Sequence, residues 1–329
     1  DAQYGFVANA AAAAHSFAPI PENEGTFRYR VLATDGNNLS ALSAESAPVV
    51  VDQTGPGAPA ATADRAPDFA GGDGWYADTV TVSFTGAVDP LLQDGSAGSG
   101  VAQYTVPQVF TTSGEHTASG KATDYAGNDS VSSELTVFVD ADDPLVAFPV
   151  CPADVLLLSD AQASWEASDA HSGLATAASG TETLDTSSIA TRSVVASATD
   201  NVAHEGSAEC AYRVVFAFSG FFKPVNNPPA QSEFSAGDVV PITFALDGDQ
   251  GMNIMAPAYP HSEAIACGTN PELEAGSPTS AARELMYKRG NGGRYTYFWA
   301  TEAGWAGTCR QLIVKLTDGT YHRANVSLL

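Results

Sequence analysis

The segment that decides the fold runs from residue 116 to residue 139. It opens with His-Thr-Ala-Ser-Gly-Lys at residues 116–121, an alternating pattern typical of a β-strand. Ala122-Thr123-Asp124 follows, and then the turn Tyr125-Ala126-Gly127-Asn128. A second strand, Thr136-Val137-Phe138-Val139, comes next. A strand, a tight turn and another strand predict a β-hairpin.

The Ala-Thr-Asp triplet of this hairpin is found in two further places. It occurs at residues 33–35 and again at residues 198–200. The copies are separated by roughly 75 to 90 residues, the size of one immunoglobulin-like sandwich. Each copy also follows an alternating strand, at residues 27–31 and 193–197. This spacing predicts an all-β fold, with tandem immunoglobulin-like β-sandwich domains in an elongated array.

A second turn motif precedes the hairpin in two of the copies. It reads Gly98-Ser99-Gly100-Val101 in one and Ser168-Asp169-Ala170-His171-Ser172-Gly173-Leu174 in the other. At these residues the chain resembles the bacterial immunoglobulin-like and fibronectin-type-III-like repeats of secreted proteins. Those repeats carry an S-D-x-x-S-G turn and an A-T-D-x-A-G-N turn. The resemblance covers residues 1–217 and implies the fold, although Asn201-Val202-Ala203-His204 departs from the second motif.

Linkers rich in proline and acidic residues separate the repeats, at residues 52–59 and 140–144. The predicted domains are a partial one at 1–52, complete ones at 53–140 and 141–217, and a C-terminal one at 218–329. Residues 1–52 would supply three or four strands, whereas a sandwich needs about seven. We expect either a piece cut from a longer array or a filament subunit. In the filament, a neighbouring copy would donate the missing strands.

The C-terminal domain differs in sequence from the repeats. Its main apolar segments lie at residues 237–246, 295–299 and 305–320. Over nearly all of residues 218–329 it resembles the PxKF domain of secreted actinobacterial repeat proteins. Thr243 stands where that family has its name-giving lysine, so no role of the amine is carried over. The resemblance implies a secreted protein and no particular activity.

Charge and hydropathy exclude two classes of partner. The formal net charge of −24 should repel nucleic acid and anionic membranes. No stretch approaches the roughly 20 apolar residues of a membrane-spanning helix, so membrane insertion is not expected. The chain opens without a signal peptide, and we therefore expect a processed product or a fragment.

The four cysteines predict two disulfides within domains, Cys151–Cys210 and Cys267–Cys309. None of them has the spacing of a zinc ligand set. Four buried free thiols are the alternative. Disulfides would place the protein in an oxidising compartment, secreted or at the cell surface.

The sequence contains no catalytic motif. We find no G-x-S-x-G, no H-E-x-x-H, no Walker loop and no dinucleotide fingerprint, and no two of the six histidines have metal-ligand spacing. The chain is therefore not expected to be an enzyme. The predicted function is an extracellular stalk or adhesion segment of a repetitive bacterial surface protein. The alternatives are a carbohydrate-binding region of a secreted hydrolase and a filament subunit that self-associates by strand complementation.

Calcium is the cofactor that the acidic linkers predict. In an immunoglobulin-like sandwich the B–C and F–G turns lie at the same pole, beside the incoming linker. Asp169 and Asp200 of these turns should therefore meet three linker acids, Asp140, Asp142 and Asp143. The earlier linker offers a poorer set, comprising Asp52, Asp89, Asp94 and Asp124. Ca²⁺ takes 6–8 oxygen ligands, and an ion here would stiffen the hinge. Alternatively, these aspartates only cap turns.

Aromatic side chains alternate along one predicted strand of the C-terminal domain. Tyr295, Tyr297 and Trp299 share one face of it. They predict either part of the core or a platform that binds a sugar ring, for which Trp299 and Trp305 are the candidate ligand-binding residues.

Overall fold

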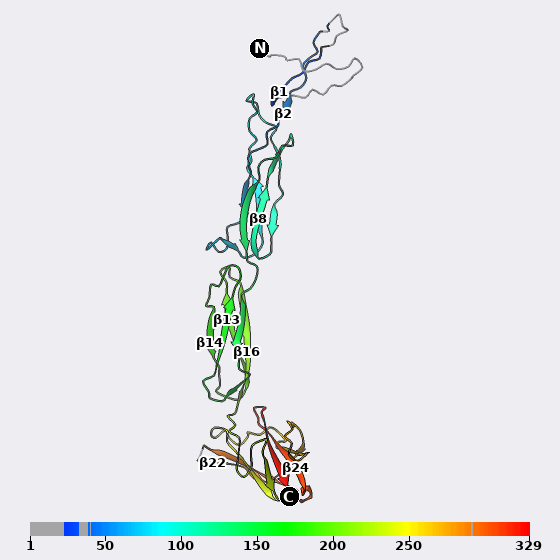
Figure 1. Cartoon of the computed structure of the whole chain (residues 1–329). Coiled ribbons are helices and arrows are strands. Elements are labelled where there is room, and N and C mark those ends of the chain that lie inside the picture. Colours follow the sequence, from blue (N-terminus) through cyan, green and yellow to red (C-terminus); the bar gives the residue numbers. More distant parts are fainter. Residues whose placement is uncertain (1–22, 33–38, 40, 291) are drawn as a thin grey trace. The chain divides into compact units, whose positions relative to one another are not determined.

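The structure is a computed structural model that describes residues 23–32, 39, 41–290 and 292–329 (Figure 1). The triplet at residues 33–35 lies outside these residues. The described chain forms two compact units. One contains the residues up to Pro144 together with Asp169–Ala175 and Thr199–Glu205. The other contains Leu145–Ser168, Thr176–Ala198 and Gly206–Leu329.

The described part of residues 1–52 contains two short strands. Strand β1 (Gly25–Phe27) pairs antiparallel with β2 (Val49–Val51). The Thr26 N–H donates to Asp94 Oδ2 at 2.8 Å, and the Gln53 N–H donates to Glu24 Oε1 at 3.0 Å. The strand expected at residues 27–31 is wrong in its bounds, because β1 ends at Phe27 and residues 28–32 are not in a strand.

Residues 60–139 form a sandwich with two main sheets. One sheet has the order β3-β5-β7 and the other β4-β10-β8, while β6 pairs with β9. The strands are β3 (Ala60–Ala63), β4 (Trp75–Tyr76), β5 (Val80–Thr85), β6 (Val101–Tyr104), β7 (Gln108–Phe110), β8 (Gly114–Gly120), β9 (Ala122–Asp124) and β10 (Ser133–Val139). Val80, Val82 and Phe84 alternate inward from β5, because successive side chains of a strand point to opposite faces.

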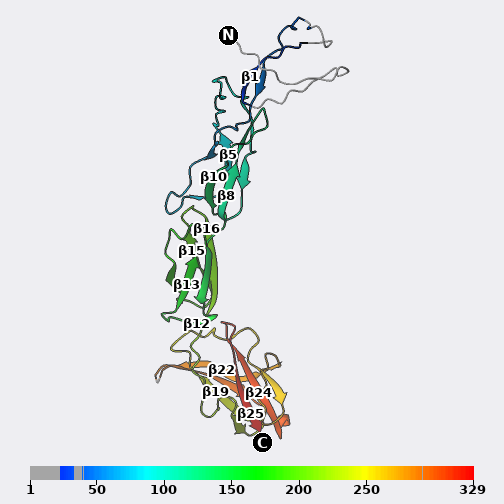
Figure 2. The same ribbon diagram turned by 45° about the horizontal axis from the view of Figure 1, so that its top comes forward.

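Residues 145–215 form a second sandwich, seen from two directions in Figures 1 and 2. Its sheets have the orders β11-β13-β14 and β12-β16-β15. The strands are β11 (Leu145–Val150), β12 (Asp154–Leu156), β13 (Gln162–Ser168), β14 (Ser179–Thr183), β15 (Thr191–Thr199) and β16 (Glu205–Val215). The core contains Ala163, Tyr212, Val214 and the disulfide residue Cys210.

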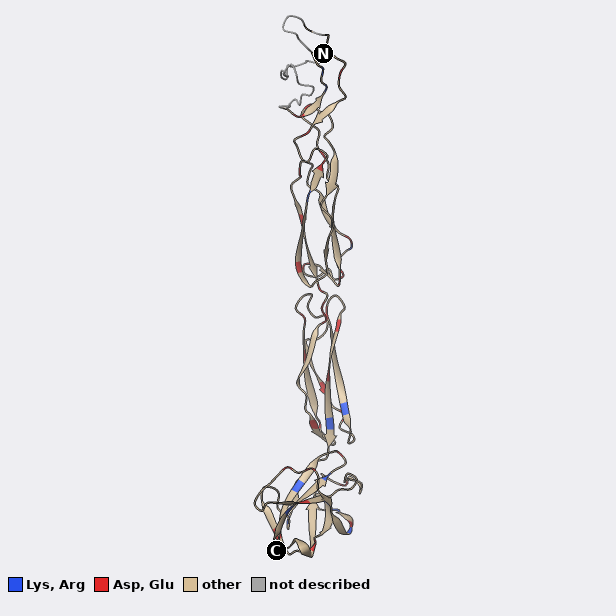
Figure 3. Ribbon diagram, turned by 90° about the vertical axis from the view of Figure 1, so that its right-hand side faces the viewer, with Lys and Arg blue, Asp and Glu red and all other residues tan. Residues whose placement is uncertain are grey.

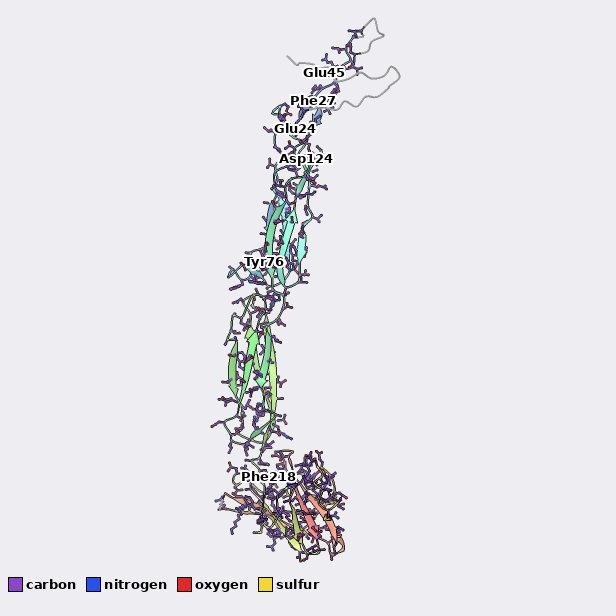
Figure 4. The ribbon with its side chains drawn as sticks, in the orientation of Figure 1. Glu24, Phe27, Glu45, Tyr76, Asp124 and Phe218 are labelled. Atoms are coloured by element: carbon purple, nitrogen blue, oxygen red, sulfur yellow. A yellow bond between two sulfur atoms is a disulfide. The ribbon has the colours of Figure 1, made fainter. Side chains whose placement is uncertain are left out.

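The C-terminal domain is a larger sandwich, with sheet orders β17-β19-β23-β22 and β18-β25-β24-β20-β21. The strands are β17 (Phe221–Phe222), β18 (Gln231–Phe234), β19 (Val239–Phe244), β20 (His261–Ile265), β21 (Ser277–Pro278), β22 (Ser280–Lys288), β23 (Arg294–Ala300), β24 (Thr308–Lys315) and β25 (Tyr321–Leu328), with the 3₁₀ turn η1 (Ala303–Trp305). Phe218, labelled in Figure 4, packs against this core.

The three sandwiches share one strand order. In each, an opening strand pairs with a long strand that pairs with a third, as in β3-β5-β7, β11-β13-β14 and β17-β19-β23. In each, a short strand pairs parallel with the last strand: β4 with β10, β12 with β16, and β18 with β25. The chain is thus an all-β protein of tandem immunoglobulin-like sandwiches, as its repeats predict.

Both predicted disulfides are confirmed. Cys151 is joined to Cys210 of β16, and Cys267 is joined to Cys309 of β24. Their Cα atoms are 5.6 and 5.1 Å apart, within the usual range for this bond. Each bond therefore closes a loop inside one sandwich.

Candidate metal centres

The first candidate centre joins a linker aspartate to two turns of the following sandwich. Asp52, Asp89 and Asp124 each place a carboxylate oxygen within 4.8 Å of the others. Asp52 lies in the linker, Asp89 begins the turn between β5 and β6, and Asp124 ends β9. Asp124, labelled in Figure 4, is only 2% exposed. Three carboxylates this close repel one another unless they are neutralised.

Backbone N–H groups hold each of these carboxylates in place. Asp52 Oδ2 accepts from the Ser99 N–H at 2.7 Å, and Asp89 Oδ2 accepts from the Gly100 N–H at 2.5 Å. Asn128 donates twice to Asp124, from its N–H to Oδ1 at 2.7 Å and from its amide Nδ2 to Oδ2 at 2.8 Å. These bonds fix the oxygens without cancelling their charge.

Two observations favour a cation at this centre. Asp89 Oδ1 is buried and has no hydrogen-bond partner among the described residues, which is costly for a carboxylate oxygen. Lys121, the basic residue nearest in sequence to Asp124, pairs instead with Asp129.

Partial burial raises the pKa of Asp52, but hydrogen bonds from Ser99 and Thr54 lower it more, so the net pKa lies below 3.8. Asp52 is therefore ionised at neutral pH.

The second candidate centre lies at the next linker and is more deeply buried. Asp140 is 0% exposed and Asp200 is 1% exposed. Asp140 Oδ2 accepts from the Ser172 N–H at 3.0 Å, and Asp140 Oδ1 accepts from the Asp142 N–H at 3.3 Å. Asp200 Oδ1 accepts from the N–H groups of Val202 and His204, both at 2.9 Å. Both buried carboxylates are thus anchored by turns.

Two histidines complete this second centre. Asp140, Asp200 and His204 place ligand atoms within 4.8 Å of one another, and so do Asp140, Asp142 and His171. His204 Nδ1 lies 3.1 Å from Asp200 Oδ2. His171 Nδ1 lies 3.9 Å from Asp140 Oδ1 and 3.7 Å from Asp142 Oδ2. The centre therefore offers nitrogen as well as oxygen donors.

The predicted ligands divide into those that converge and those that do not. Asp52, Asp89 and Asp124 come together at the first linker, and Asp140, Asp142 and Asp200 come together with histidines at the second. Asp169 instead caps its own turn, because its Oδ1 accepts from the N–H groups of His171 at 3.1 Å and Gly173 at 2.7 Å. Asp143 is exposed and belongs to neither set. Asp94 binds Thr26 and Ser96.

Spacing along the chain does not reveal the two histidines as candidate metal ligands. His171 and His204 come from different turns, which folding brings to the same linker residue. A signal was present at His204, which stands four residues after the repeated aspartate, where the preceding copy has Asn128. A comparison of the two copies therefore shows an imidazole at His204 where the other copy has the amide of Asn128.

The aromatic candidates belong to the C-terminal core. Trp299 and Tyr295 of the same strand are 0% exposed, and Tyr297 is 5% exposed. The expected role of Trp299 in ligand binding is therefore corrected, because a ring without exposed surface cannot stack on a sugar. Trp305 is half-buried, with the Arg310 guanidinium carbon 3.9 Å from its ring centroid and Trp299 on another side. Arg310 occupies a position over the ring that a sugar would need.

Comparison with known proteins gives no family assignment. No protein-family model matches the chain, and no curated protein matches it. Among solved structures, the chain is similar to the N-terminal eight Ig domains of Down Syndrome Cell Adhesion Molecule. The TM-score is 0.25 and the identity 9%, over 77% of this chain and 39% of that one.

Two further solved structures are similar at the same level. A putative membrane anchored protein from Corynebacterium diphtheriae matches with a TM-score of 0.19 and 10% identity, over 92% of this chain and 88% of that one. Domains 4–9 of surface layer protein SbsC match with a TM-score of 0.20 and 13% identity, over 84% of this chain and 48% of that one. Likenesses this distant carry no argument about function. Among the described residues, no helix is long and apolar enough to cross a bilayer.

Proposed function

We propose that this chain is an extracellular, non-catalytic structural or adhesion segment whose acidic linkers are fixed by bound cations. The observation that carries the proposal is the same at both linkers. Asp52 and Asp140 each accept a hydrogen bond from the serine N–H of a turn in the following sandwich, and each meets further ligand-type side chains there. A cation at such a point would hold the linker to the turns.

Composition and disulfides support an extracellular role. Both disulfides need an oxidising compartment to form and persist. Acidic side chains occur in all parts of the described chain, whereas most Lys and Arg residues lie beyond residue 190 (Figure 3). The linkers are therefore surrounded by negative charge, which attracts divalent cations and repels anionic polymers.

A non-catalytic role is supported by the lining of a groove in the C-terminal domain. The groove contains Met255, Tyr259, Leu285 and Tyr297, and Glu284 is the only carboxylate among its lining residues. Glycoside hydrolysis ordinarily needs a pair of carboxyl groups. Carbohydrate binding through Trp299 is not supported, because the ring is buried.

Calcium is the ion that we propose for the Asp52 centre. Its donors are carboxylate oxygens from three separate segments, and Ca²⁺ accepts many oxygen ligands in irregular geometry. Asp89 Oδ1, the buried oxygen without a donor, would gain the ion as its partner. The remaining positions would be filled by water or backbone carbonyl oxygens.

Thermal unfolding of the whole chain tests this proposal. An ion that binds only the folded state adds about 2.7 kcal/mol of stability at 100 times its Kd, so calcium should raise the unfolding midpoint of the domain at residues 53–140 over that in chelator. Asp89→Asn should abolish the rise. Asp73→Asn, an exposed aspartate of the same sandwich, is the matched control and should keep it. Equal midpoints with calcium and with chelator would overturn the proposal.

A further inference from the structure

The Asp140 centre contains a buried imidazole nitrogen that no group in the described part of the chain satisfies. His171 Nδ1 is buried and has no hydrogen-bond partner among the described residues. Two carboxylate oxygens lie near it, Asp140 Oδ1 at 3.9 Å and Asp142 Oδ2 at 3.7 Å, and both are beyond hydrogen-bonding distance. An unsatisfied polar atom at a carboxylate cluster needs an explanation, and a bound metal ion supplies one.

We propose that this centre binds a transition-metal ion of the zinc class, with His171 Nδ1, Asp140 Oδ1 and Asp142 Oδ2 as protein ligands. Zn²⁺ lies about 2.0–2.1 Å from nitrogen and oxygen ligands, which places tetrahedral ligands about 3.4 Å apart. The observed separations of 3.7 and 3.9 Å are close to this value. Atoms that are too far apart to bond directly are thus suitably placed to share an ion.

The exposure of the three side chains suits an ion that reaches the site from solvent. Asp140 is fully buried, the His171 side chain is 27% exposed and the Asp142 side chain is 64% exposed. An ion can therefore enter past Asp142 and keep a solvent ligand in its fourth position. Ser172 supports the assignment, because it is 8% exposed and its hydroxyl also has no partner among the described residues. Its N–H donates to Asp140 Oδ2 at 3.0 Å, so the Ser172 backbone adjoins the centre.

Asp200 and His204 have a different role in this proposal. They bond to each other at 3.1 Å, in the same way that Asn128 bonds to Asp124 in the preceding sandwich. We assign them to positioning the turn beside Asp140, since Asp200 accepts three hydrogen bonds within its own turn.

The donor set selects against calcium at this centre. Imidazole suits Zn, Cu and Ni ions, whereas Ca²⁺ takes oxygen ligands. The inference rests on the proposed function only in treating the linkers as cation sites, and it replaces the calcium expected at Asp140 with a softer ion. The two linkers of one chain would then bind different metals.

Titration of the full chain with Zn²⁺ in excess calcium tests the inference, with Co²⁺ as a spectroscopic substitute. We expect stoichiometric Zn²⁺ binding by calorimetry and visible Co²⁺ absorption of a nitrogen-containing site. His171→Gln and Asp142→Asn should each weaken Zn²⁺ binding by at least about 10-fold. The matched controls are His116→Gln, a histidine of β8, and Asp143→Asn, the neighbouring linker acid, and both should bind as the wild type does.

Tryptophan fluorescence and circular dichroism test whether the ion binds at His171 and whether the variant is folded. Trp75 lies 6.1 Å from the His171 ring, so Cu²⁺ at this centre should quench tryptophan fluorescence, and Trp75→Phe should remove that part of the quenching. His171 Nδ1 has no hydrogen-bond partner in the described part of the chain, so His171→Gln should fold normally by circular dichroism. No Zn²⁺ binding by the wild type, or equal binding by folded His171→Gln, overturns the inference. The calcium-dependent midpoint of the Asp52 centre is scored separately, so the two proposals fail independently.

Discussion

The two linker centres use the same backbone contacts but differ in the side chains around them. In both, a linker aspartate accepts from a serine N–H, a turn aspartate accepts from a glycine N–H, and a third aspartate accepts from the residue four positions later. The matching residues are Asp52, Asp89, Asp124, Ser99, Gly100 and Asn128 in one and Asp140, Asp169, Asp200, Ser172, Gly173 and His204 in the other.

The difference between the centres follows from the length of one turn. Asp89 and Gly100 are 11 positions apart, whereas Asp169 and Gly173 are four apart. In the short turn Asp169 Oδ1 caps two N–H groups, and in the long turn Asp89 Oδ1 has no donor among the residues that the structure describes. The unsatisfied atom is thus an oxygen in one centre and the nitrogen of His171 in the other. Small changes around a common frame thus change which atom lacks a partner, and this is the basis on which we propose different ions for the two centres.

The largest expected effect compares the sandwich at residues 145–215, which contains the Cys151–Cys210 disulfide, with the sandwich at residues 60–139, which contains no cysteine. Replacing Cys151 and Cys210 by serine opens a loop of 59 residues and should cost about 4 kcal/mol in the free energy of unfolding. The sandwich at residues 60–139 should be unaffected. Differential scanning calorimetry of the full chain should show one transition moved to lower temperature and another unmoved. A uniform shift would contradict this expectation.

The next effect compares the two linker aspartates. Asp140→Ala, measured in chelator, leaves the N–H of buried Ser172 without its acceptor and should cost about 2 kcal/mol. Asp52→Ala removes the same kind of bond to Ser99 at a more exposed position, and it should cost about 1 kcal/mol. Chemical denaturation of both variants measures the difference. Equal costs would mean that burial does not distinguish the linkers.

A smaller effect tests whether His204 positions a turn. His204→Asn should change stability by less than about 0.5 kcal/mol, because an asparagine amide at this position can donate to Asp200 as Asn128 does to Asp124. His204→Ala should cost about 1 kcal/mol, because the side-chain bond is lost. Denaturation in chelator distinguishes them. Equal losses in both variants would argue that the ring packs rather than bonds.

The smallest effect is a pH dependence at Asp52. Its pKa is lowered on folding from 3.8, so its ionised form stabilises the folded state above that pH. This stability is lost as the pH falls from 3.8 through the lower native pKa. The free-energy gap between wild type and Asp52→Asn, measured in chelator, should therefore close over that acidic interval. A gap that stays constant down to strongly acidic pH would contradict the assigned direction.

Much of the fold could be predicted because local sequence patterns determine where its strands and turns lie. The Ala-Thr-Asp triplets at residues 122–124 and 198–200 lie at the ends of β9 and β15, and alternation in β5 and β23 fixes the buried faces. The cysteine pairs also follow from their positions. The ion ligands were only partly predictable, since the sequence supplies the aspartates but does not say which oxygens are already bonded. Asp169 was expected as a ligand and is a cap, because the next N–H groups lie within its reach.

The role of His171 could not be predicted from the spacing of residues along the chain. Among the residues that the structure describes, His171 Nδ1 has no acceptor close enough to bond, and that fact depends on the path of two turns and a linker. Trp299 shows the reverse problem. Alternation placed it on one face of a strand, but the face becomes core only because a second sheet covers it.

The two disulfides also determine how far the chain could lengthen under tension. A pull on both ends that unravelled the sandwich at residues 145–215 would stop at Cys151 and Cys210, since the covalent bond bypasses the segment between them. At about 3.4 Å per extended residue, the 59-residue separation corresponds to roughly 200 Å of contour that stays locked. The 42-residue separation in the C-terminal domain withholds about 140 Å more. The sandwich before Asp140 has no such bond, so it alone of the three could release its full length.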